Sequence, residues 1–293
     1  MKKMIVAALL AGALAMTACG GKTAEPAAEA PAEETAAEET AEETTEEAPA
    51  EETEEAEAES VSIVENIETE LENGVLTVRV PEGSSVFGFS WGLYTGDKGD
   101  ASLTELITGS DQEAGYDYVG SFKALEDQGE GEDYIRIAYA NANITLAYFD
   151  IHVTVKDNAI QEITAVDTLK TGFEEDYLST AEGAWVEEGE GAGSMSITKG
   201  QNMAYEVIIA KDTGKDGEIV LTTMHAYPDA VLGCLVYADG AEQKAAVSDS
   251  EEDALEIGGG SLTGKIFSDS TEDGAPRMTW IDSDGESLPF VME

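Results

Sequence analysis

The residues of this sequence that could perform chemistry are few, and the sequence does not bring them together. His152 and His225 are its two histidines, and each stands in the middle of a predicted strand. A histidine pair used in catalysis or metal binding would have to lie within a few ångströms, whereas these two fall in separate predicted units. We therefore interpret both as ordinary strand residues.

Acidic turns are the second place where potential ligands cluster. Residues 282–286 read Asp-Ser-Asp-Gly-Glu, and residues 97–100 hold two more aspartates. Hard oxygen ligands suit Ca²⁺, but neither turn completes an EF-hand, which needs a bidentate Glu at its twelfth position. The alternative is that Asp, Gly and Ser simply form turns. We predict no metal site and no cofactor.

Nucleophilic chemistry has equally little support. The chain contains no His-Glu-x-x-His motif and no phosphate-binding loop. Cys234 lies in an apolar, strand-like segment, residues 230–237, where a free cysteine is typically a small buried apolar residue. Carboxylates are so abundant that no acid–base pair stands out. The sequence therefore predicts a protein that is not an enzyme.

The charge balance excludes one class of partner. The formal net charge is −47 at pH 7, from 62 acidic and 15 basic residues. Such a field repels the phosphates of nucleic acids and anionic membrane surfaces, so we exclude nucleic-acid binding. The charge is compatible with cationic partners, and equally with an acidic extracellular surface that has no specific partner.

The first sixty residues indicate where the protein acts. Lys2 and Lys3 precede an apolar run at residues 4–16, which is too short to span the ~30 Å hydrocarbon core of a bilayer as a helix. A basic start, an apolar middle and small residues before Cys19 are typical of a secretory signal. Residues 19–60 are mostly Ala, Glu, Thr and Pro, and predict a disordered, self-repelling tether.

Met16-Thr17-Ala18-Cys19 resembles the lipobox of bacterial lipoproteins, with Met16 in a position that Leu usually holds. The resemblance implies that residues 1–18 form a signal peptide and that Cys19 becomes the lipid-anchored first residue of the mature protein. It also implies a place on the extracytoplasmic face of the cell membrane of a Gram-positive bacterium. The alternative is an ordinary secretory signal in which Cys19 has no role.

Residues 61–168 alternate with the period of two that is typical of strands. Trp91 is the expected core aromatic residue, and residues 103–107 alone favour a short helix. About seven strands at this spacing favour an immunoglobulin-like sandwich. The predicted strands lie at residues 75–80, 86–94, 117–125, 134–139, 146–155 and 159–166, with a hairpin turn at residues 156–158 before the last.

The same region resembles the chagasin-type cysteine peptidase inhibitors, which share this sandwich. The resemblance rests on the order of the strand segments, on Gly88-Phe89-Ser90-Trp91 and on Ser121-Phe122-Lys123-Ala124. In that family three loops inhibit the peptidase, but residues 83–88 and 140–143 lack the working residues of the first and third loops. The resemblance therefore implies the fold, and it leaves peptidase inhibition as an alternative function.

Residues 172–293 predict a meander of about eight or nine strands, which favours a small up-and-down barrel. Its predicted strands include residues 194–199 and the closing strand 287–292, and its predicted turns include residues 228–229 and 239–240. Gly183-Ala184-Trp185, together with Trp280 and Phe290 near the end of the chain, resembles the lipocalin-like domains of the calycin type. This resemblance implies that Gly183 and Trp185 close the base of the barrel. Such a barrel either holds one small apolar ligand or is packed with side chains, and both alternatives remain open.

These observations predict an all-β protein in which a disordered tether carries a sandwich and a barrel away from the membrane. We expect a non-enzymatic surface protein that works by binding or adhesion. Its expected partners are the membrane, through lipidated Cys19, and an extracellular ligand or protein, and we expect the chain to be a monomer. The alternatives are an inhibitor of cysteine peptidases and a carrier of a small apolar ligand in the barrel.

Overall fold

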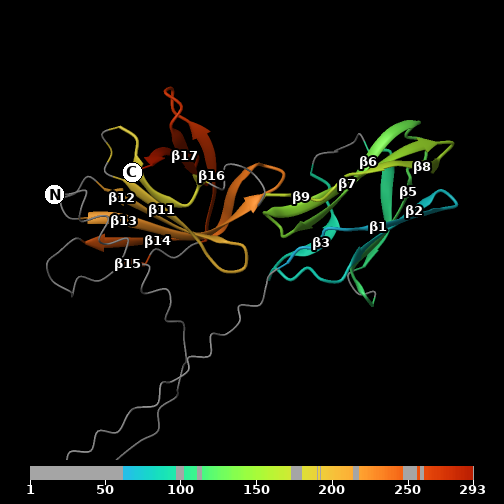
Figure 1. The fold of residues 1–293 in the computed structure, drawn as a ribbon, viewed down its shortest axis with the longest axis horizontal. Coiled ribbons are helices and arrows are strands. Elements are labelled where there is room, and N and C mark those ends of the chain that lie inside the picture. The colour runs from blue at the N-terminus through green and yellow to red at the C-terminus, as the bar shows by residue number, and fades with distance from the viewer. Residues whose placement is uncertain are drawn as a thin grey trace, which may run out of the picture.

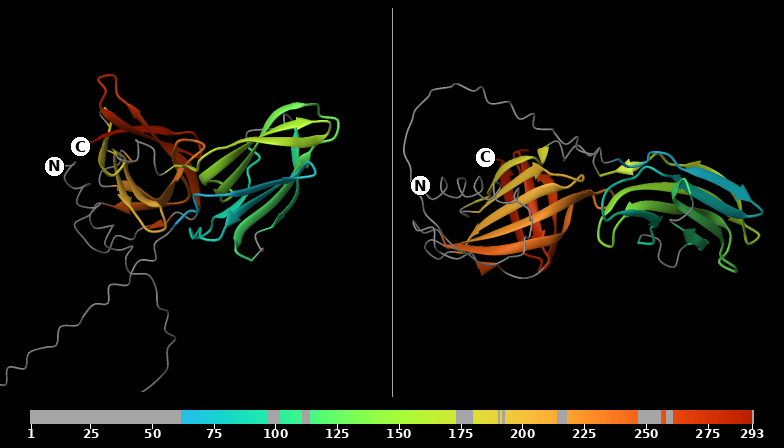
Figure 2. Two further views of the ribbon diagram at one scale, coloured as in Figure 1. Left: turned by 45° about the vertical axis from the view of Figure 1, so that its right-hand side comes forward. Right: turned by 90° about the horizontal axis from the view of Figure 1, so that it is seen from below.

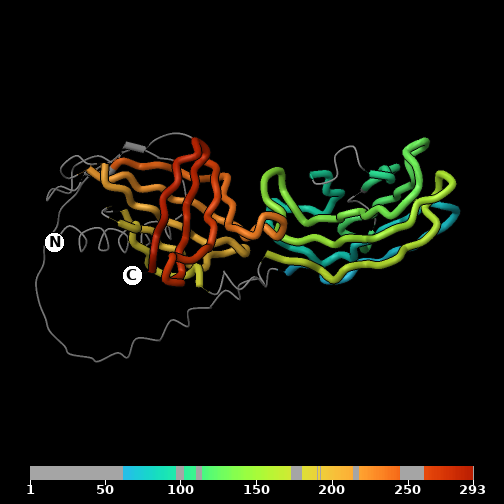
Figure 3. The backbone as a smooth tube through the Cα atoms, turned by 90° about the horizontal axis from the view of Figure 1, so that it is seen from above, coloured from blue at the N-terminus to red at the C-terminus, as the bar shows by residue number. Residues whose placement is uncertain are grey.

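The computed structural model shows two adjoining all-β units, a sandwich and a barrel (Figure 1). The same two units are seen from other directions in Figure 2 and Figure 3. The predicted fold class, an immunoglobulin-like sandwich followed by an up-and-down barrel, is confirmed. The expected signal peptide and tether, and the acidic turn at residues 97–100, lie outside the described residues. The structure describes residues 62–96, 102–110, 114–172, 180–189, 191, 193–213, 218–246, 256–257 and 261–292.

Two antiparallel sheets form the sandwich. The first has the strand order β1-β2-β5-β4, and the second has the order β3-β6-β7-β8, with β9 also paired to β7. This is the order of a constant-type immunoglobulin domain, whose sheets are ABED and CFG, with β8 as an extra strand. The short β9 lies just beyond residue 168, where the sandwich was expected to end. The strands are β1 (Glu68–Glu72), β2 (Val75–Pro81), β3 (Ser90–Leu93), β4 (Thr104–Ser110), β5 (Tyr116–Ala124), β6 (Gly131–Ala140), β7 (Thr145–Lys156), β8 (Ala159–Val166) and β9 (Lys170–Thr171).

Trp91 stands in the core between the two sheets. Its side chain is buried, and its ring centroid lies 5.5 Å from that of Phe149 and 5.3 Å from that of Tyr139. The indole N–H donates a hydrogen bond to Ser84 Oγ at 2.8 Å, so the polar edge of the ring is satisfied inside the core. The prediction of Trp91 as the core aromatic residue is confirmed.

Two hairpins of the sandwich turn on residues with positive φ. Asp157 and Asn158, at φ of 53° and 55°, form the predicted turn between β7 and β8. Asn73 and Gly74, at 51° and 78°, form a second such turn between β1 and β2, which was not predicted. Positive φ at both central residues marks a type I′ turn, for which Asn-Gly is the strongest sequence signal. A Cβ on Gly74 would lie 2.9 Å from that of Ala159, so this position also needs glycine for space.

The helix expected at residues 103–107 is wrong, because most of this segment belongs to β4. Leu106 and Thr108 lie opposite consecutive residues of β5, so Ile107 is an extra residue in a β-bulge. The bulge interrupts the period of two and leaves apolar residues at positions 103, 106 and 107. Because this is also the i, i+3, i+4 spacing of a helical face, the sequence favoured a helix.

The second unit is a closed antiparallel barrel of eight strands. Strands that follow one another in the chain pair with one another, and β18 pairs with β10, so the meander closes on itself. Closure removes the exposed edges that an open sheet would have. The short β15 (Glu256–Ile257) pairs with β14 outside the ring. The ring consists of β10 (Gly183–Glu187), β11 (Ser194–Lys199), β12 (Tyr205–Asp212), β13 (Glu218–Asp229), β14 (Cys234–Ala246), β16 (Leu262–Ser270), β17 (Pro276–Asp282) and β18 (Ser287–Met292).

The turn that Asp239-Gly240 would predict is absent from the described chain, since β14 continues through these residues. The pairing of β14 with β16 shifts between Tyr237 and Gly240, so the segment is an irregularity within a long strand. A Cβ on Gly240 would lie 2.9 Å from that of Leu262, so glycine allows β16 to approach. Turn-forming residues within a strand pattern therefore mark a bulge here. The turn predicted at residues 228–229 likewise falls at residues 230–233.

Large side chains pack the barrel interior. At its centre the indole N–H of Trp280 donates a hydrogen bond to the hydroxyl group of Tyr237 at 2.8 Å. Burial raises the pKa of Tyr237 to about 12. The interior of the described strands is thus occupied by the protein's own side chains. The other large buried side chains of this cluster are Trp185, Met195, Ile197, Tyr205, Val207, Ile209, Met224, Leu235, Ile266, Met278 and Phe290.

Candidate functional site

The two residues expected at the base of the barrel lie in the strand pair that closes it. Gly183 and Trp185 belong to β10, which pairs with β18. Trp185 is buried, and its indole N–H donates a hydrogen bond to the carbonyl oxygen of Ala181 at 3.0 Å. Gly183 has a φ of +146°, which side chains rarely adopt. Cys19, the predicted lipidation site, lies outside the described residues.

The two histidines lie in different units, and each contacts a carboxylate. Nε2 of His152 is 3.4 Å from Asp167, and Nδ1 of His225 is 2.6 Å from Asp239. In the acidic turn at residues 282–286, Oδ1 of Asp282 accepts the N–H groups of residues 284 and 286, so it stabilises the turn itself. Among the described residues, no group of three or more His, Cys, Asp or Glu side chains is placed to hold a metal ion.

Two short matches to hydrolase motifs occur in the chain, and neither has the geometry that the chemistry needs. Residues 88–92 read Gly-Phe-Ser-Trp-Gly, but Ser90 begins β3 and pairs with Ala140, whereas a nucleophile elbow is a turn from a strand to a helix. Ser196 and Lys199 have Ser-x-x-Lys spacing, but both lie in β11. Residues three apart in a strand point to opposite faces, so these two side chains are directed apart.

A buried carboxylate holds the junction between the sandwich and the barrel. Asp229, at the end of β13, is 3% exposed, and its Oδ2 accepts the N–H of Thr145 in β7 at 2.8 Å. Its Oδ1 accepts the N–H groups of Val231 and Leu232 at 2.9 and 2.8 Å. The N–H of Ala230 donates back to the carbonyl oxygen of Thr145 at 2.7 Å. Main-chain groups of both units therefore meet around one side chain.

Apolar contacts extend this junction. The ring centroid of Phe89 in the sandwich lies 5.2 Å from that of Tyr227 in the barrel. Cys234 and Val236 of β14 are buried against the sandwich core. Burial raises the pKa of Cys234 to about 12, so the thiol stays protonated and unreactive at neutral pH. The interpretation of Cys234 as a buried apolar residue is confirmed.

The outer surface of the second sandwich sheet carries a connected group of aromatic and charged side chains. The pairing of β6 with β7 assembles most of it, because Tyr134 lies opposite His152 and Arg136 opposite Asp150. The residues that alternate with them, such as Ile135, point into the core, as the pleat of a strand requires. We call this group the tyrosine–arginine face, and it consists of Tyr94, Tyr134, Arg136, Tyr148, Asp150, His152, Asp167 and Lys170.

Arg136 and Asp150 form the centre of this face. Nε of Arg136 lies 2.8 Å from Oδ1 of Asp150, and Nη2 lies 3.0 Å from Oδ2, which is the bidentate geometry of a strong pair. The two side chains are 12% and 8% exposed. The guanidinium carbon lies 4.1 Å from the ring centroid of Tyr148, 5.6 Å from that of Tyr134 and 5.7 Å from that of Tyr94. Cation–π contacts thus hold three tyrosine rings around one buried ion pair.

Asp167 contacts the two other basic side chains of the face. It lies 3.1 Å from Nζ of Lys170 and 3.4 Å from Nε2 of His152. The hydrogen bond between Asp167 and Lys170 lowers the pKa of the carboxyl group and raises the pKa of the amine. Nζ of Lys170 also lies 5.4 Å from the ring centroid of Tyr148. The charges of the face therefore compensate one another, in a chain whose net charge is −47.

The tyrosine–arginine face was not predicted from the sequence, although part of its signal was present. Tyr134 and Arg136 share one face of a predicted strand, and Tyr148, Asp150 and His152 share one face of the next. Pairing the two strands across their hairpin would have placed these two sets side by side. Polar residues on the outer face of a strand are so common that neither set is unusual by itself.

Comparisons with protein-family models, with curated proteins and with solved structures gave no match to this chain. The described residues include no helix that is both long enough and apolar enough to cross a membrane. The function proposed below therefore rests on the residues of the site and on the features of the sequence.

Proposed function

We propose that this protein is a lipid-anchored, extracytoplasmic binding protein, and that the tyrosine–arginine face contacts its ligand, a glycan. The observation that carries the proposal is the set of three tyrosines held around the buried pair of Arg136 and Asp150. In this proposal Cys19 carries the lipid and residues 19–60 form the tether. Residues 61–168 and 172–293 form two modules that act by binding or adhesion rather than by catalysis.

The chemistry of the face suits a ligand that is rich in hydroxyl groups. One side of a sugar ring presents C–H groups that pack on aromatic rings, while its hydroxyl groups bond to polar side chains around them. The tyrosine rings can pack against the C–H groups of a sugar, and the partly exposed His152, Asp167 and Lys170 can form hydrogen bonds with its hydroxyl groups. Because Arg136 already holds the rings in place, binding would cost little side-chain entropy.

Charge favours an uncharged glycan over an anionic one. The chain carries 62 acidic residues against 15 basic ones, and the field of this excess repels anionic polymers. On the tyrosine–arginine face, in contrast, Arg136 is paired with Asp150 and Lys170 is paired with Asp167. A neutral ligand meets neither attraction nor repulsion there, so shape and hydrogen bonding decide its affinity.

The first described residues of the chain lie near the junction between the sandwich and the barrel. The N–H of Ser62 donates to Oγ of Ser85 at 3.2 Å, and its hydroxyl donates to the carbonyl oxygen of Gly83 at 2.6 Å. Ile63 and Ile67 border a groove of about 730 Å³ that also includes Met203 of the barrel. If the tether is attached near the middle of the folded body, the sheet faces of the body, rather than its two ends, can lie along the surface that is bound.

The two alternative functions have less support. Residues 83–88 and 140–143, which correspond to two inhibitory loops of chagasin-type proteins, lie at the end of the sandwich that adjoins the barrel. Val86 is hydrogen-bonded to the hydroxyl group of Tyr139, and Thr145 is hydrogen-bonded to Asp229 of the barrel. A peptidase approaching these loops would meet the barrel. A carried apolar ligand is not supported by an interior that is occupied by large side chains.

The proposed binding face is tested with the chain from Gly20 onwards, which omits Cys19 and its lipid, by measuring its depletion from solution by insoluble starch, chitin, cellulose and purified bacterial cell-wall glycan. Tyr148→Ala should weaken binding to the preferred glycan by at least about tenfold, by analogy with nucleic-acid bases, whose stacking on one aromatic ring contributes about 1–3 kcal/mol. Tyr148→Phe keeps the ring and should retain binding. Tyr116→Ala removes a tyrosine from the other sheet and is the matched control.

Two outcomes would contradict the proposal. The first is binding that Tyr148→Ala and Tyr116→Ala weaken to the same extent, with both variants still folded by circular dichroism. The second is the absence of binding by the unaltered chain to any of these glycans at millimolar sugar concentration.

The proposed anchor is tested by fractionating cells that express the full chain. The chain should partition with the membrane, and Cys19→Ala should release it, since a lipid chain contributes about 0.8 kcal/mol for each buried CH₂ group. Cys234→Ala alters the other cysteine, which is buried in the body, and should leave the chain in the membrane fraction. Retention of Cys19→Ala in the membrane would contradict lipidation at this position.

A further inference from the structure

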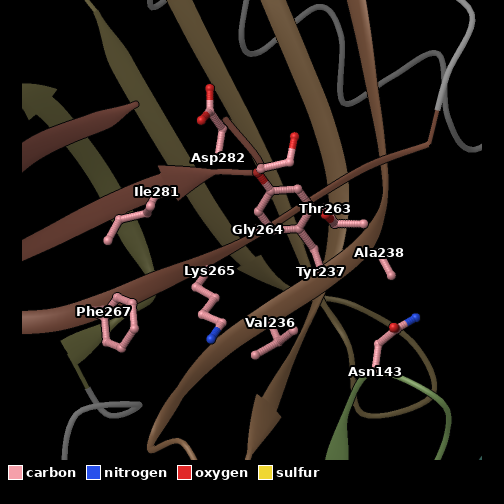
Figure 4. A pocket seen from close by; sticks show the side chains of 11 residues that line it. Asn143, Val236, Tyr237, Ala238, Thr263, Gly264, Lys265, Phe267, Ile281 and Asp282 are labelled. Atoms are coloured by element: carbon pink, nitrogen blue, oxygen red, sulfur yellow. The ribbon is translucent and has the colours of Figure 1, made fainter. Parts of the chain in front are cut away.

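A groove of about 490 Å³ crosses the outside of the barrel beside the sandwich (Figure 4). Its apolar walls are Val236 of β14, Phe267 of β16 and Ile281 of β17. These side chains point outward, because the residues that alternate with them, such as Ile266, lie in the barrel core. Asn143 of the sandwich borders the same groove, so both units contribute to it.

Lys265 lines this groove and has no partner among the residues that the structure describes. It lies between Val236 and Ile281, its neighbours on the two adjacent strands, and it is only partly exposed. Among the described residues, no carboxylate or carbonyl group forms an ion pair or hydrogen bond with its amine. Two other lysines on the described strands are paired, Lys123 with Glu105 at 3.0 Å and Lys211 with Glu286 at 3.0 Å. Lys156 and Lys199 form no ion pair among the described residues, but both are exposed, whereas Lys265 is only partly exposed.

The absence of a partner is not a consequence of composition, because the chain has 62 acidic residues for 15 basic ones. A partly buried ammonium group that lacks a counter-charge loses hydration without gaining an ion pair, which is unfavourable. Such a group among apolar walls becomes favourable when a ligand supplies the counter-charge. A concave, mostly apolar groove of this volume, in which few charged groups fix orientation, has the usual features of a small-molecule site. Asp282 also lines the groove, and its Oδ1 accepts the N–H groups of residues 284 and 286 in its own turn.

We propose that this groove binds an amphipathic organic anion, namely a compact aliphatic or aromatic carboxylate. The carboxylate would pair with Nζ of Lys265, and the apolar body would pack on Val236, Phe267 and Ile281. A second copy of this chain is a poor occupant, because two chains of net charge −47 repel each other. The site is separate from the tyrosine–arginine face, so it stands independently of the function proposed above.

Binding here would also strengthen the junction. Val236 packs against the sandwich core, and Asn143 lies close to Thr145, which is hydrogen-bonded to Asp229 of the barrel. A ligand that touches residues of both units in the folded state, and not in the unfolded chain, stabilises the folded state by mass action.

The experiment uses the chain from Gly20 onwards, without Cys19, and three probes of equal chain length, octanoate, octanol and octylammonium. Binding is measured by isothermal titration and by the shift of the melting temperature at low ionic strength. We expect octanoate to bind at least tenfold more tightly than octanol, and octylammonium not to bind. Lys265→Met keeps the length of the side chain and removes its charge, and should lower octanoate affinity at least tenfold.

Two further variants make the test specific. Lys265→Arg keeps the charge and should retain octanoate binding, and Lys156→Met removes an exposed lysine of the sandwich and should have no effect. The proposal is overturned if octanoate shows no binding at about 10 mM, a concentration at which even a site with a Kd of about 1 mM would be mostly occupied. It is also overturned if Lys265→Met and Lys156→Met bind octanoate equally well, or if octylammonium binds more tightly than octanoate.

Discussion

The sandwich and the barrel both bury tyrosines and both carry a basic side chain on the outer side of a sheet. The two units differ in whether these side chains have hydrogen-bond or ion-pair partners. In the sandwich, the hydroxyl group of buried Tyr118 has no hydrogen-bond partner among the described residues, whereas Arg136 is fully paired. In the barrel, the hydroxyl group of Tyr237 accepts a hydrogen bond from Trp280, whereas Lys265 has no partner in the described structure.

This difference shows that polar groups are satisfied by local geometry and not by overall composition. Arg136 lies opposite an aspartate across a hairpin, so its partner is supplied by strand register. Lys265 lies between two apolar residues on adjacent strands, so strand register supplies it with no carboxylate partner, although the chain as a whole is rich in acidic residues. The sandwich therefore uses its base for stability, and the barrel leaves its base available to a ligand.

The largest expected effect is that of Asp150→Ala. This change leaves the guanidinium group of Arg136 buried without its counter-charge, and it should lower the free energy of unfolding by about 3–5 kcal/mol. Urea denaturation measures the loss. Lys265→Met should change stability by less than about 0.5 kcal/mol, because it breaks no ion pair. Similar losses from both changes would remove the contrast between the two bases. Replacing both partners, Arg136→Met with Asp150→Leu, should recover most of the loss.

The next effect is that of Asp229→Ala at the junction of the two units. Three main-chain N–H groups lose their acceptor, which should cost about 2–3 kcal/mol. Scanning calorimetry should then resolve two transitions, one for each unit, where the unaltered chain shows one. Asp229→Asn keeps one acceptor oxygen and should have a smaller effect. A single unshifted transition in Asp229→Ala would mean that the carboxylate does not couple the units.

Tyr118 and Tyr237 should respond to the same substitution with opposite signs. Tyr237→Phe leaves the buried indole N–H of Trp280 without an acceptor and should destabilise the protein by about 1–2 kcal/mol. Tyr118→Phe removes a hydroxyl group that makes no hydrogen bond in the described structure, and should be neutral or stabilising by up to about 1 kcal/mol. Thermal melts of both variants decide the matter. A comparable loss in both would show that the hydroxyl group of Tyr118 does have a partner.

The smallest of these effects is absent at neutral pH. It is a loss of stability at alkaline pH, to which both units should contribute. Burial raises the pKa of Tyr118 and of Tyr237 from 10.0 to about 12. The unfolded chain therefore loses these protons first, and stability present below pH 10 is lost as the pH rises towards about 12. Melting temperatures between pH 9 and 12 measure this loss, and Tyr118→Phe should reduce its slope. An unchanged slope in Tyr118→Phe would contradict the assignment of part of the loss to this residue.

Much of the fold could be predicted because a period of two reports directly on burial. The predicted and observed bounds of β11 and β18 are the same, since each is a short alternating run between clear turns. The errors occurred where a bulge interrupts this period, at Ile107 in β4 and near Gly240 in β14. A bulge adds one residue to a strand, and no local residue pattern distinguishes it from a turn or from a helical spacing.

The sequence by itself determined the acidic character of the chain, the isolation of its two histidines, its all-β class and the candidate anchor at Cys19. Only the tertiary structure decided which outward-facing residues become neighbours. The tyrosine–arginine face draws Asp167 from the connection after β8 and Lys170 from β9, and the groove around Lys265 combines three barrel strands with Asn143 of the sandwich. The physical reason is that alternation shows on which face a residue lies. It does not show which strand, or which unit, lies beside that face, because register and docking are set by contacts between distant parts of the chain.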